Sequence, residues 1–324
     1  MTIEKLDLIR EWHPQFESEK IEVTTHSSQS MMQLARQNDV INQKYLELLH
    51  HDFMLGEHKD GVSFFMQRSK WTWMRKDILK KHGIFYTVEL PDIKYRNMPD
   101  NNLVVIFSFF GTDSSNAGLR TFPEYFPDIQ KNIKKGTTIL RIMDFNLSHG
   151  SFYLNTVNYP DFETNIQKVI RSVISEKNID DGNVVLLGSS KGGTGALYHG
   201  LMGNWKSLSI DPITNDNFFV NEKKDWHFMI GSRELDFVPE MKQLAKIGNR
   251  QAIVVGDSMV PETFKDLERL NGSRRIKIYD TKNPLAYMHS LVGPSAKIEM
   301  VTLLNLLLDS QLSKWVSQLG EQNE

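Results

Sequence analysis

The sequence predicts an α/β fold in which a mostly parallel sheet carries helices on both faces. Short, continuous apolar runs recur after residue 100, and such runs are typical of strands buried on both faces. Helical segments separate these runs, and a regular alternation of strand and helix produces a parallel sheet. The predicted strands are 103–111, 137–145, 183–189, 206–211, 226–231, 251–257 and 275–280, and the clearest helices are 161–177 and 261–270.

The first hundred residues have a different character. Residues 29–55 repeat apolar side chains at helical spacing, and 61–67 and 84–90 have the pattern of short strands. The helical stretch lacks the length and the heptad regularity of a free coiled coil. We therefore expect residues 1–100 to form an extension that packs on a domain comprising residues 101–324.

Composition and charge exclude several classes of protein. With 324 residues, 40% of them hydrophobic, the chain can bury one large core or two modest ones. A net charge of -2 gives no overall attraction to nucleic acid or to an anionic membrane. The lack of cysteine excludes disulfides, thiolate metal sites and cysteine nucleophiles, and we expect no metal. We find neither a secretory signal nor a membrane-spanning stretch, so we expect a cytoplasmic protein, with attachment to the inner face of the membrane left open.

The stretch VVLLGSSKGGTGALYHGL, residues 184–201, joins a predicted strand to a helix through small residues. Gly188, Ser190 and Gly192 match G-x-S-x-G, the nucleophile elbow of the α/β-hydrolases. In that turn, the residues two before and two after the serine need to lack side chains. Ser189 fails this test because Leu187 stands two positions before it. A phosphate-binding loop would place the lysine after the glycines, which is not the order here. The sequence therefore predicts an α/β-hydrolase-like fold with Ser190 as nucleophile.

A serine nucleophile needs a base that removes its proton. Three histidines follow Ser190 in the chain. His199 falls on the helix after the elbow, and His227 falls within a predicted strand. His289 follows the last predicted strand and precedes a C-terminal helix, which is the position of the base in this fold. We therefore predict His289 as the base.

Two predicted strand ends offer the acid that orients the base. Asp257 ends the strand 251–257, with one helix and one strand between it and His289. Asp236, with Glu234 nearby, lies in a similar sequence context, because the segment after Asp236 and the segment after Asp257 both end in Val-Pro. The spacing favours Asp257, and Asp236 is the alternative.

The oxyanion hole of such a site takes one amide from the residue after the nucleophile, here Lys191. The second amide comes from the loop after an early strand, and residues 107–118 offer Gly111 and Thr112. A further group of aromatic and amide side chains after the second strand could form a sugar-binding wall or belong to the core. These residues are Phe152, Tyr153, Asn155 and Tyr159.

The elbow GSSKGGTGALYHGL, the segment DFNLSHGSFYLNT at 144–156 and the final Asp–His pair resemble bacterial glycan-assembly proteins. The similar families are the XcbB/CpsF family of capsular polysaccharide biosynthesis and, more distantly, accessory Sec proteins that O-acetylate adhesin glycans. The resemblance covers about residues 100–300. It implies a Ser-His-acid triad and the transfer of an acetyl group to a sugar hydroxyl, and only Ser190 and His289 carry over by position.

The predicted chemistry is acyl transfer through an acyl-serine intermediate, by an O-acetyltransferase or an acetyl esterase. The resemblance implies a bacterial surface or capsular polysaccharide as substrate and acetyl-CoA as a possible acyl donor. Other capsule-assembly proteins are possible partners, and nucleic acid is not expected. The alternative is a non-enzymatic scaffold of a capsule or glycan-export complex, for which the N-terminal extension would be the docking surface.

Overall fold

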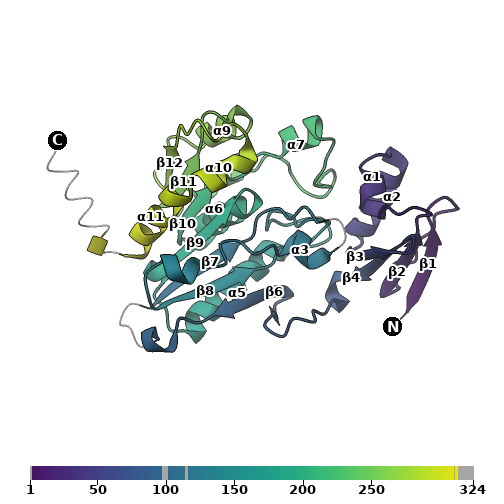
Figure 1. Ribbon diagram of the computed structural model, residues 1–324, viewed down its shortest axis with the longest axis horizontal. Coiled ribbons are helices and arrows are strands. Elements are labelled where there is room, and N and C mark those ends of the chain that lie inside the picture. The colour runs from purple at the N-terminus through teal and green to yellow at the C-terminus, as the bar shows by residue number, and fades with distance from the viewer. Residues whose placement is uncertain (1, 97–100, 114–115, 310, 313–324) are drawn as a thin grey trace.

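The computed structural model describes residues 2–96, 101–113, 116–309 and 311–312 (Figure 1). Its centre is an eight-stranded sheet in the order β12-β11-β10-β9-β7-β8-β6-β5. Neighbouring strands from β12 to β8 are parallel, and β6 and β5 run antiparallel. The predicted α/β fold with a mostly parallel sheet is confirmed. The strands are β5 (Leu79–Lys81), β6 (Ile84–Glu89), β7 (Asn102–Phe107), β8 (Thr137–Ile142), β9 (Val184–Ser189), β10 (Lys206–Ile210), β11 (Ala252–Gly256) and β12 (Ile276–Asp280).

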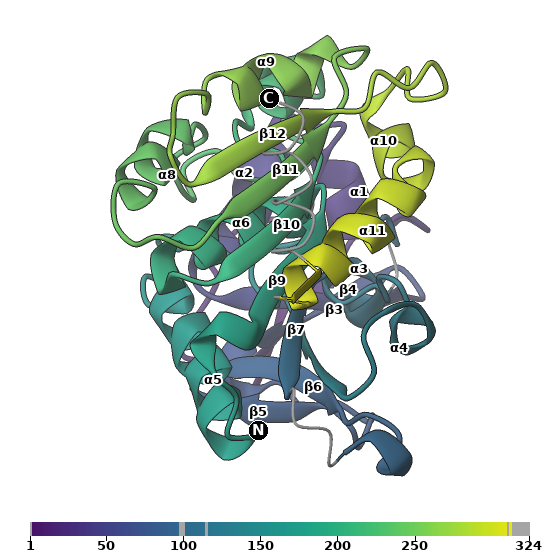
Figure 2. The same cartoon turned by 90° about the vertical axis from the view of Figure 1, so that its left-hand side faces the viewer.

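Helices cover both faces of this sheet (Figure 2). α5, α6 and α8 lie on one face, and α4, α10 and α11 lie on the other. In α5, buried apolar side chains recur at positions 162, 166, 169, 170 and 173, so one stripe of the helix faces the sheet. The helices of this part are α3 (Ala117–Thr121), α4 (Ile129–Asn132), α5 (Phe162–Glu176), α6 (Lys191–Gly203), α7 (Asn217–Glu222), α8 (Val238–Leu244), α9 (Pro261–Glu268), α10 (His289–Ser295) and α11 (Lys297–Leu308).

Residues 2–67, called here the N-terminal layer, form a second sheet in the order β1-β2-β4-β3. Two helices accompany it, and Figure 1 shows these elements together on one side of the central sheet. The ring of Tyr45 lies 4.8 Å from that of Phe228, within a buried cluster that joins the layer to the rest of the chain. Its elements are β1 (Ile3–Asp7), β2 (Lys20–Thr24), α1 (Met31–Ala35), α2 (Asp39–His50), β3 (Phe53–Lys59) and β4 (Val62–Gln67).

The predicted helical stretch 29–55 is two helices and the start of a strand. The Asn38 side chain accepts hydrogen bonds from the amides of Val40 and Ile41, so it caps α2 and separates it from α1. The predicted strand 84–90 is β6, which pairs with β8. The small sheet ends at Gln67, and β5 and β6, which fall within the expected extension of residues 1–100, belong to the central sheet.

The prediction of a strand at 226–231 is wrong. The Asp225 carboxylate accepts hydrogen bonds from the amides of Met229 and Ile230, which folds this apolar stretch into a turn. Phe228 has a φ of 60°, and Asp225 one of 49°, values that a strand does not contain. Local hydrogen bonding by an aspartate thus overrides the apolar pattern.

No single helix of the described residues is long and apolar enough to cross a membrane; α10 and α11 meet that test only as a pair, and a 62° bend separates them.

Candidate active site

Ser190 lies in a sharp turn between β9 and α6. Its φ of 55° and ψ of -124° fall in a region that residues with a side chain rarely adopt. A Cβ atom at Gly188 would lie 2.0 Å from the carbonyl oxygen of Gly192, and one at Gly192 would lie 2.1 Å from that of Phe107. Both flanking positions therefore have to be glycine. The steric reason for the G-x-S-x-G spacing is present in the structure.

A chain of two hydrogen bonds connects Ser190 to a carboxylate. Ser190 Oγ lies 2.7 Å from His289 Nε2, and His289 Nδ1 lies 2.7 Å from Asp211 Oδ2. The Asp211 side chain is buried, whereas Ser190 and His289 are partly exposed. The structure brings Ser190 and His289 together as the sequence predicts, and it supplies an acid that the sequence argument did not consider.

Asp211 directly follows β10, the neighbour of β9, so it lies at the same edge of the sheet as the elbow. Its other carboxylate oxygen accepts a hydrogen bond of 2.9 Å from the Thr263 hydroxyl in α9. This second bond fixes the orientation of the carboxylate toward His289. The order Ser190, Asp211, His289 is the chain order of α/β-hydrolase triads.

Asp257 and Asp236 are not the partners of His289, so both predictions of the acid are corrected. Asp257 accepts hydrogen bonds from the amides of Met259 and Asn283 and from the Thr281 hydroxyl, and it thereby ties two loops together. Asp236 forms an ion pair of 2.7 Å with Arg269. Both carboxylates therefore bind groups other than the His289 imidazole.

The other histidines after Ser190 lie elsewhere. His199 is fully buried between the Gln167 side chain and the carbonyl of Tyr153. His227 bonds to Asp216 at 2.9 Å, and Arg233 bonds to the other oxygen of that carboxylate. Neither imidazole contacts Ser190.

The predicted second amide of the oxyanion hole needs revision. The Gly111 amide donates to the carbonyl of Arg120 at 3.3 Å, so it is already used. Thr112 is exposed, and no hydrogen bond among the described residues links it to the elbow. The Lys191 amide stands in the first turn of α6, where backbone N–H groups have no partner within the helix.

The Lys191 side chain points into the protein and is fully buried. Its ammonium group lies 3.2 Å from Asp144 Oδ2 and donates to the carbonyl oxygen of His149 at 2.8 Å. Burial lowers the pKa of Lys191, and the Asp144 carboxylate opposes that shift. The ion pair thus anchors the start of α6 to the loop that follows β8. The sequence shows no pattern that would reveal it.

The aromatic residues predicted as a sugar wall or as core belong to the core. Phe152 and Tyr153 are fully buried, and Tyr159 is 7% exposed. Tyr153 packs edge-on against Phe107 and donates to the carbonyl of Ser108. The Asn155 side chain accepts a hydrogen bond from the amide of Glu163. None of the four forms an open surface.

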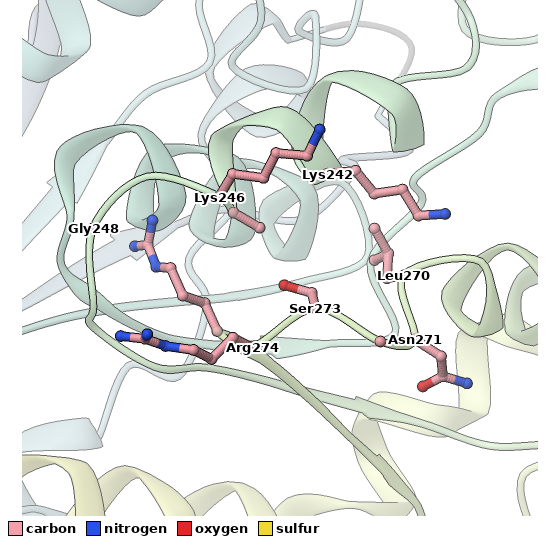
Figure 3. A pocket seen from close by; sticks show the side chains of 10 residues that line it. Lys242, Lys246, Gly248, Leu270, Asn271, Ser273 and Arg274 are labelled. Atoms are coloured by element: carbon pink, nitrogen blue, oxygen red, sulfur yellow. The ribbon is translucent and has the colours of Figure 1, made fainter.

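Several cavities of the described residues lie away from Ser190, and two of them bear on the argument below. A groove of about 870 Å³ between the N-terminal layer and α3 is lined by Trp71 and Trp73, among others. A smaller cavity of about 380 Å³ lies where the chain enters β11 and β12, at the edge of the sheet opposite the elbow (Figure 3). There Lys242, Lys246 and Arg274 extend in different directions. No group of three His, Asp or Glu side chains within the described ranges is placed to hold a metal ion.

Comparison with known proteins finds similarity of structure only. No protein-family model matches the chain, and no curated protein matches it in sequence. A chain of the glycosylation-associated protein complex (Gap123) from Streptococcus agalactiae is similar in structure, with a TM-score of 0.52 and 14% sequence identity. This match covers 78% of the present chain and 51% of the other, so our chain spans about half the length of that relative.

The capsule O-acetyltransferase of Neisseria meningitidis serogroup A is also similar, with a TM-score of 0.50 and 15% identity over 74% of this chain and 98% of that one. A mutant of that enzyme in complex with CoA matches with the same TM-score and identity, over 72% and 94% of the two chains. These likenesses support the α/β-hydrolase-like fold.

Proposed function

We propose that this protein is a serine-dependent acyltransferase or esterase that forms an acyl intermediate on Ser190. The observation that carries the proposal is the hydrogen-bonded chain Ser190–His289–Asp211, with 2.7 Å at each step. It lies at the carboxyl ends of the strands, where open α/β sheets bind ligands. The strained backbone of Ser190 presents its hydroxyl to solvent, as a nucleophile requires.

In the first half of the reaction, Ser190 Oγ attacks the carbonyl carbon of the acyl donor. The serine proton passes to His289 Nε2, and Asp211 accepts the Nδ1–H bond and stabilises the imidazolium. The tetrahedral intermediate then expels the leaving group, which takes the proton back from Nε2. Ser190 is left as an ester of the acyl group.

In the second half, an acceptor hydroxyl gives its proton to His289 Nε2 as its oxygen attacks the acyl carbon. Collapse of this second intermediate returns the proton to Ser190 Oγ and releases the acylated product. If the acceptor is water the protein is an esterase, and if it is a sugar hydroxyl the protein is a transferase. The triad serves both outcomes.

The Lys191 amide is one donor to the developing oxyanion. For the second we propose the Phe109 amide, because Gly192 packs against the carbonyl oxygens of Phe107 and Ser108, immediately before Phe109. Two backbone amides aimed at the charge that forms in the transition state are a large source of rate acceleration.

We propose a sugar hydroxyl of a bacterial surface or capsular polysaccharide as acceptor and acetyl-CoA as donor. The motif resemblance supports this choice, and so does the structural similarity to a capsule O-acetyltransferase and to a mutant of that enzyme in complex with CoA. We further propose that the groove of about 870 Å³, which lies away from Ser190, holds a distant part of the polysaccharide chain, because aromatic side chains beside polar ones suit the mixed apolar and hydroxylated surface of a sugar. Trp71 and Trp73 line it together with Asn116 and Glu57. We propose a cytoplasmic location, where acetyl-CoA is made.

Labelling with a fluorophosphonate probe tests the nucleophile. We expect the wild-type protein and Ser189→Ala to be labelled, and Ser190→Ala to remain unlabelled while keeping its folded circular-dichroism spectrum. Absence of labelling in the folded wild-type protein would instead favour the alternative, a scaffold that keeps the fold without the activity.

A further inference from the structure

Two arginines at the border of the N-terminal layer, the half-buried Arg36 and the buried Arg120, form no ion pair with an acidic side chain among the described residues. Arg36, at the end of α1, places Nη2 3.3 Å from His149 Nε2. Arg120, in α3, donates to the carbonyl oxygens of Ser148 and Leu55. Within the described part of the chain, neither guanidinium forms an ion pair with Asp or Glu. Burying an unpaired charge is strongly unfavourable, so this pair of cations requires an explanation.

Three polar atoms of the same cluster lack hydrogen-bond partners: Arg36 Nε, Arg120 Nη1 and His149 Nδ1. Because Arg36 donates to His149 Nε2, the imidazole carries its hydrogen on Nδ1, and all three atoms are donors. Arg120 is 1% exposed and His149 is fully buried. Burial lowers the pKa of His149, and the nearby Arg36, Arg120 and Lys191 lower it further, so the imidazole is neutral. The cluster thus holds three unpaired donors and two guanidinium charges, and Asp113 is the acidic side chain whose charge acts on Arg120.

The cluster is adjacent to the elbow. The carbonyl oxygen of His149 holds the ammonium group of Lys191, the residue after the nucleophile, at 2.8 Å. A row of neighbouring aromatic rings also connects His149 in the cluster to His289 in the triad, with centroid separations between 4.6 and 6.1 Å. The row runs His149, Phe110, His227, Phe219 and His289.

Arg36 itself is accessible. It is partly exposed, and its guanidinium lies 4.4 Å from the ring centre of Trp226, which is 48% exposed. A planar guanidinium binds phosphate and carboxylate oxygens through paired N–H groups, and stacking on an indole holds it in place. Arg120 and His149 lie behind it and add positive potential and a donor. Burial lowers the pKa of Arg36 to about 10, with Arg120 adding to the shift, so the side chain stays charged at pH 7.

We propose that Arg36, supported by Arg120 and His149, binds an anionic group of a substrate that is acylated or deacylated at Ser190. This inference rests on the proposed function. The group is a phosphate or a carboxylate, carried by the acyl donor or by an acidic polysaccharide acceptor. It neutralises the cationic cluster and orients the substrate along the row of rings toward His289.

Thermal unfolding of the full chain tests binding without any chemistry. Inorganic phosphate, compared with sodium chloride at equal ionic strength, is expected to raise the Tm of the wild-type protein more than that of Arg36→Gln. Phosphate also stabilises proteins non-specifically, and the variant corrects for this effect. Arg36→Lys keeps the charge and is expected to retain part of the difference. Ser190→Ala is expected to respond as the wild type does, which separates this result from failure of the proposed function.

Arg274→Gln is the matched control, because Arg274 lines a separate cationic cavity, the one of about 380 Å³ where the chain enters β11 and β12 (Figure 3). We expect it to respond to phosphate as the wild type does. Three results would overturn the proposal. The first is an equal rise in Tm with phosphate for the wild type and Arg36→Gln, and the second is a rise that is lost in Arg274→Gln alone. The third is an adventitious ion only, in which phosphate raises the Tm of the wild type no more than sodium chloride does.

Steady-state kinetics then identify the source of the anion. In Arg36→Gln, KM is expected to rise at least tenfold more for the charged substrate than for a neutral acetyl ester. A selective rise for acetyl-CoA assigns the anionic group to the donor, and one for an acidic oligosaccharide assigns it to the acceptor. An equal loss with the neutral ester and both charged substrates would make Arg36 a purely structural residue and contradict the proposal.

Discussion

At the scale of single residues, Ser190 combines an unfavourable backbone conformation with a favourable hydrogen bond from its side chain to His289. Its φ of 55° and ψ of -124° cost of the order of 1–3 kcal/mol. The Ser190 amide bonds to the carbonyl of Ile210 at 2.9 Å, and the glycines on either side allow the chains to approach. The surrounding contacts therefore hold the strained turn in place and direct the hydroxyl toward His289.

Replacing Asp211 by asparagine tests the acid. The asparagine amide would donate to His289 Nδ1 and leave the hydrogen on Nε2, which then cannot accept the serine proton. By analogy with the serine proteases, turnover of an acetyl ester should fall by about 10⁴-fold. Asp257→Asn is the control, because Asp257 bonds only to loop groups, and it should lower stability far more than turnover. A larger loss of turnover in Asp257→Asn would refute the assignment.

His199 should make stability depend on pH. Burial lowers its pKa from 6.5 to about 4, so below pH 6.5 the unfolded chain binds a proton that the folded chain does not. The contribution of His199 to the free energy of unfolding is thus fully present above pH 6.5. It declines by about 1.4 kcal/mol per pH unit as the pH falls toward 4. Urea unfolding of wild type and His199→Gln across that range measures the difference, and parallel curves would show that His199 is not the cause.

At the scale of elements, strands were easier to predict than loops. Burial on both faces leaves continuous apolar runs, so β7 to β12 could be located from the sequence. The stretch 226–231 has the same composition, and only the contacts of Asp225 distinguish it as a turn. Asp211 is the last residue of the predicted strand 206–211, but the spacing to His289 along the chain favours the later strand end at Asp257, and only the folded structure shows that Asp211 is the carboxylate that reaches His289.

Apart from the Ser190–His289 pair, which the elbow motif predicts, contacts between distant elements could not be predicted. Arg36 and His149 are 113 positions apart, and the Lys191–Asp144 ion pair joins a helix to a loop from another part of the chain. A single sequence carries no record of such pairings. The elbow was predictable because its steric requirement is local: Gly188 and Gly192 lie within two residues of Ser190.

At the scale of the whole molecule, the N-terminal layer and the central sheet share one core. Met31, Tyr45 and Phe53 are fully buried in a cluster that also contains Leu147 and Phe228. Apolar surface on both sides would meet water if the layer were removed. The layer is thus a part of the fold, and it also delivers Arg36 to the neighbourhood of the elbow.

A chain that lacks residues 1–70 should not fold cooperatively, because the missing layer covers the apolar cluster around Phe228. Its thermal unfolding should be broad or absent and should be accompanied by aggregation, while the full chain unfolds in a sharp transition. A shortened chain with a sharp transition and wild-type ester hydrolysis would show that the layer is independent.

The most direct test of the central claim is to locate the acyl group on the protein. After brief exposure to an activated acetyl ester, acid quenching and proteolysis, fragmentation mass spectrometry should place one acetyl group on Ser190. The same treatment of His289→Ala should leave Ser190 unmodified, because the base is missing. An acetyl group on Ser189 alone, or none on Ser190 in a wild-type protein that turns over the ester, would contradict the account.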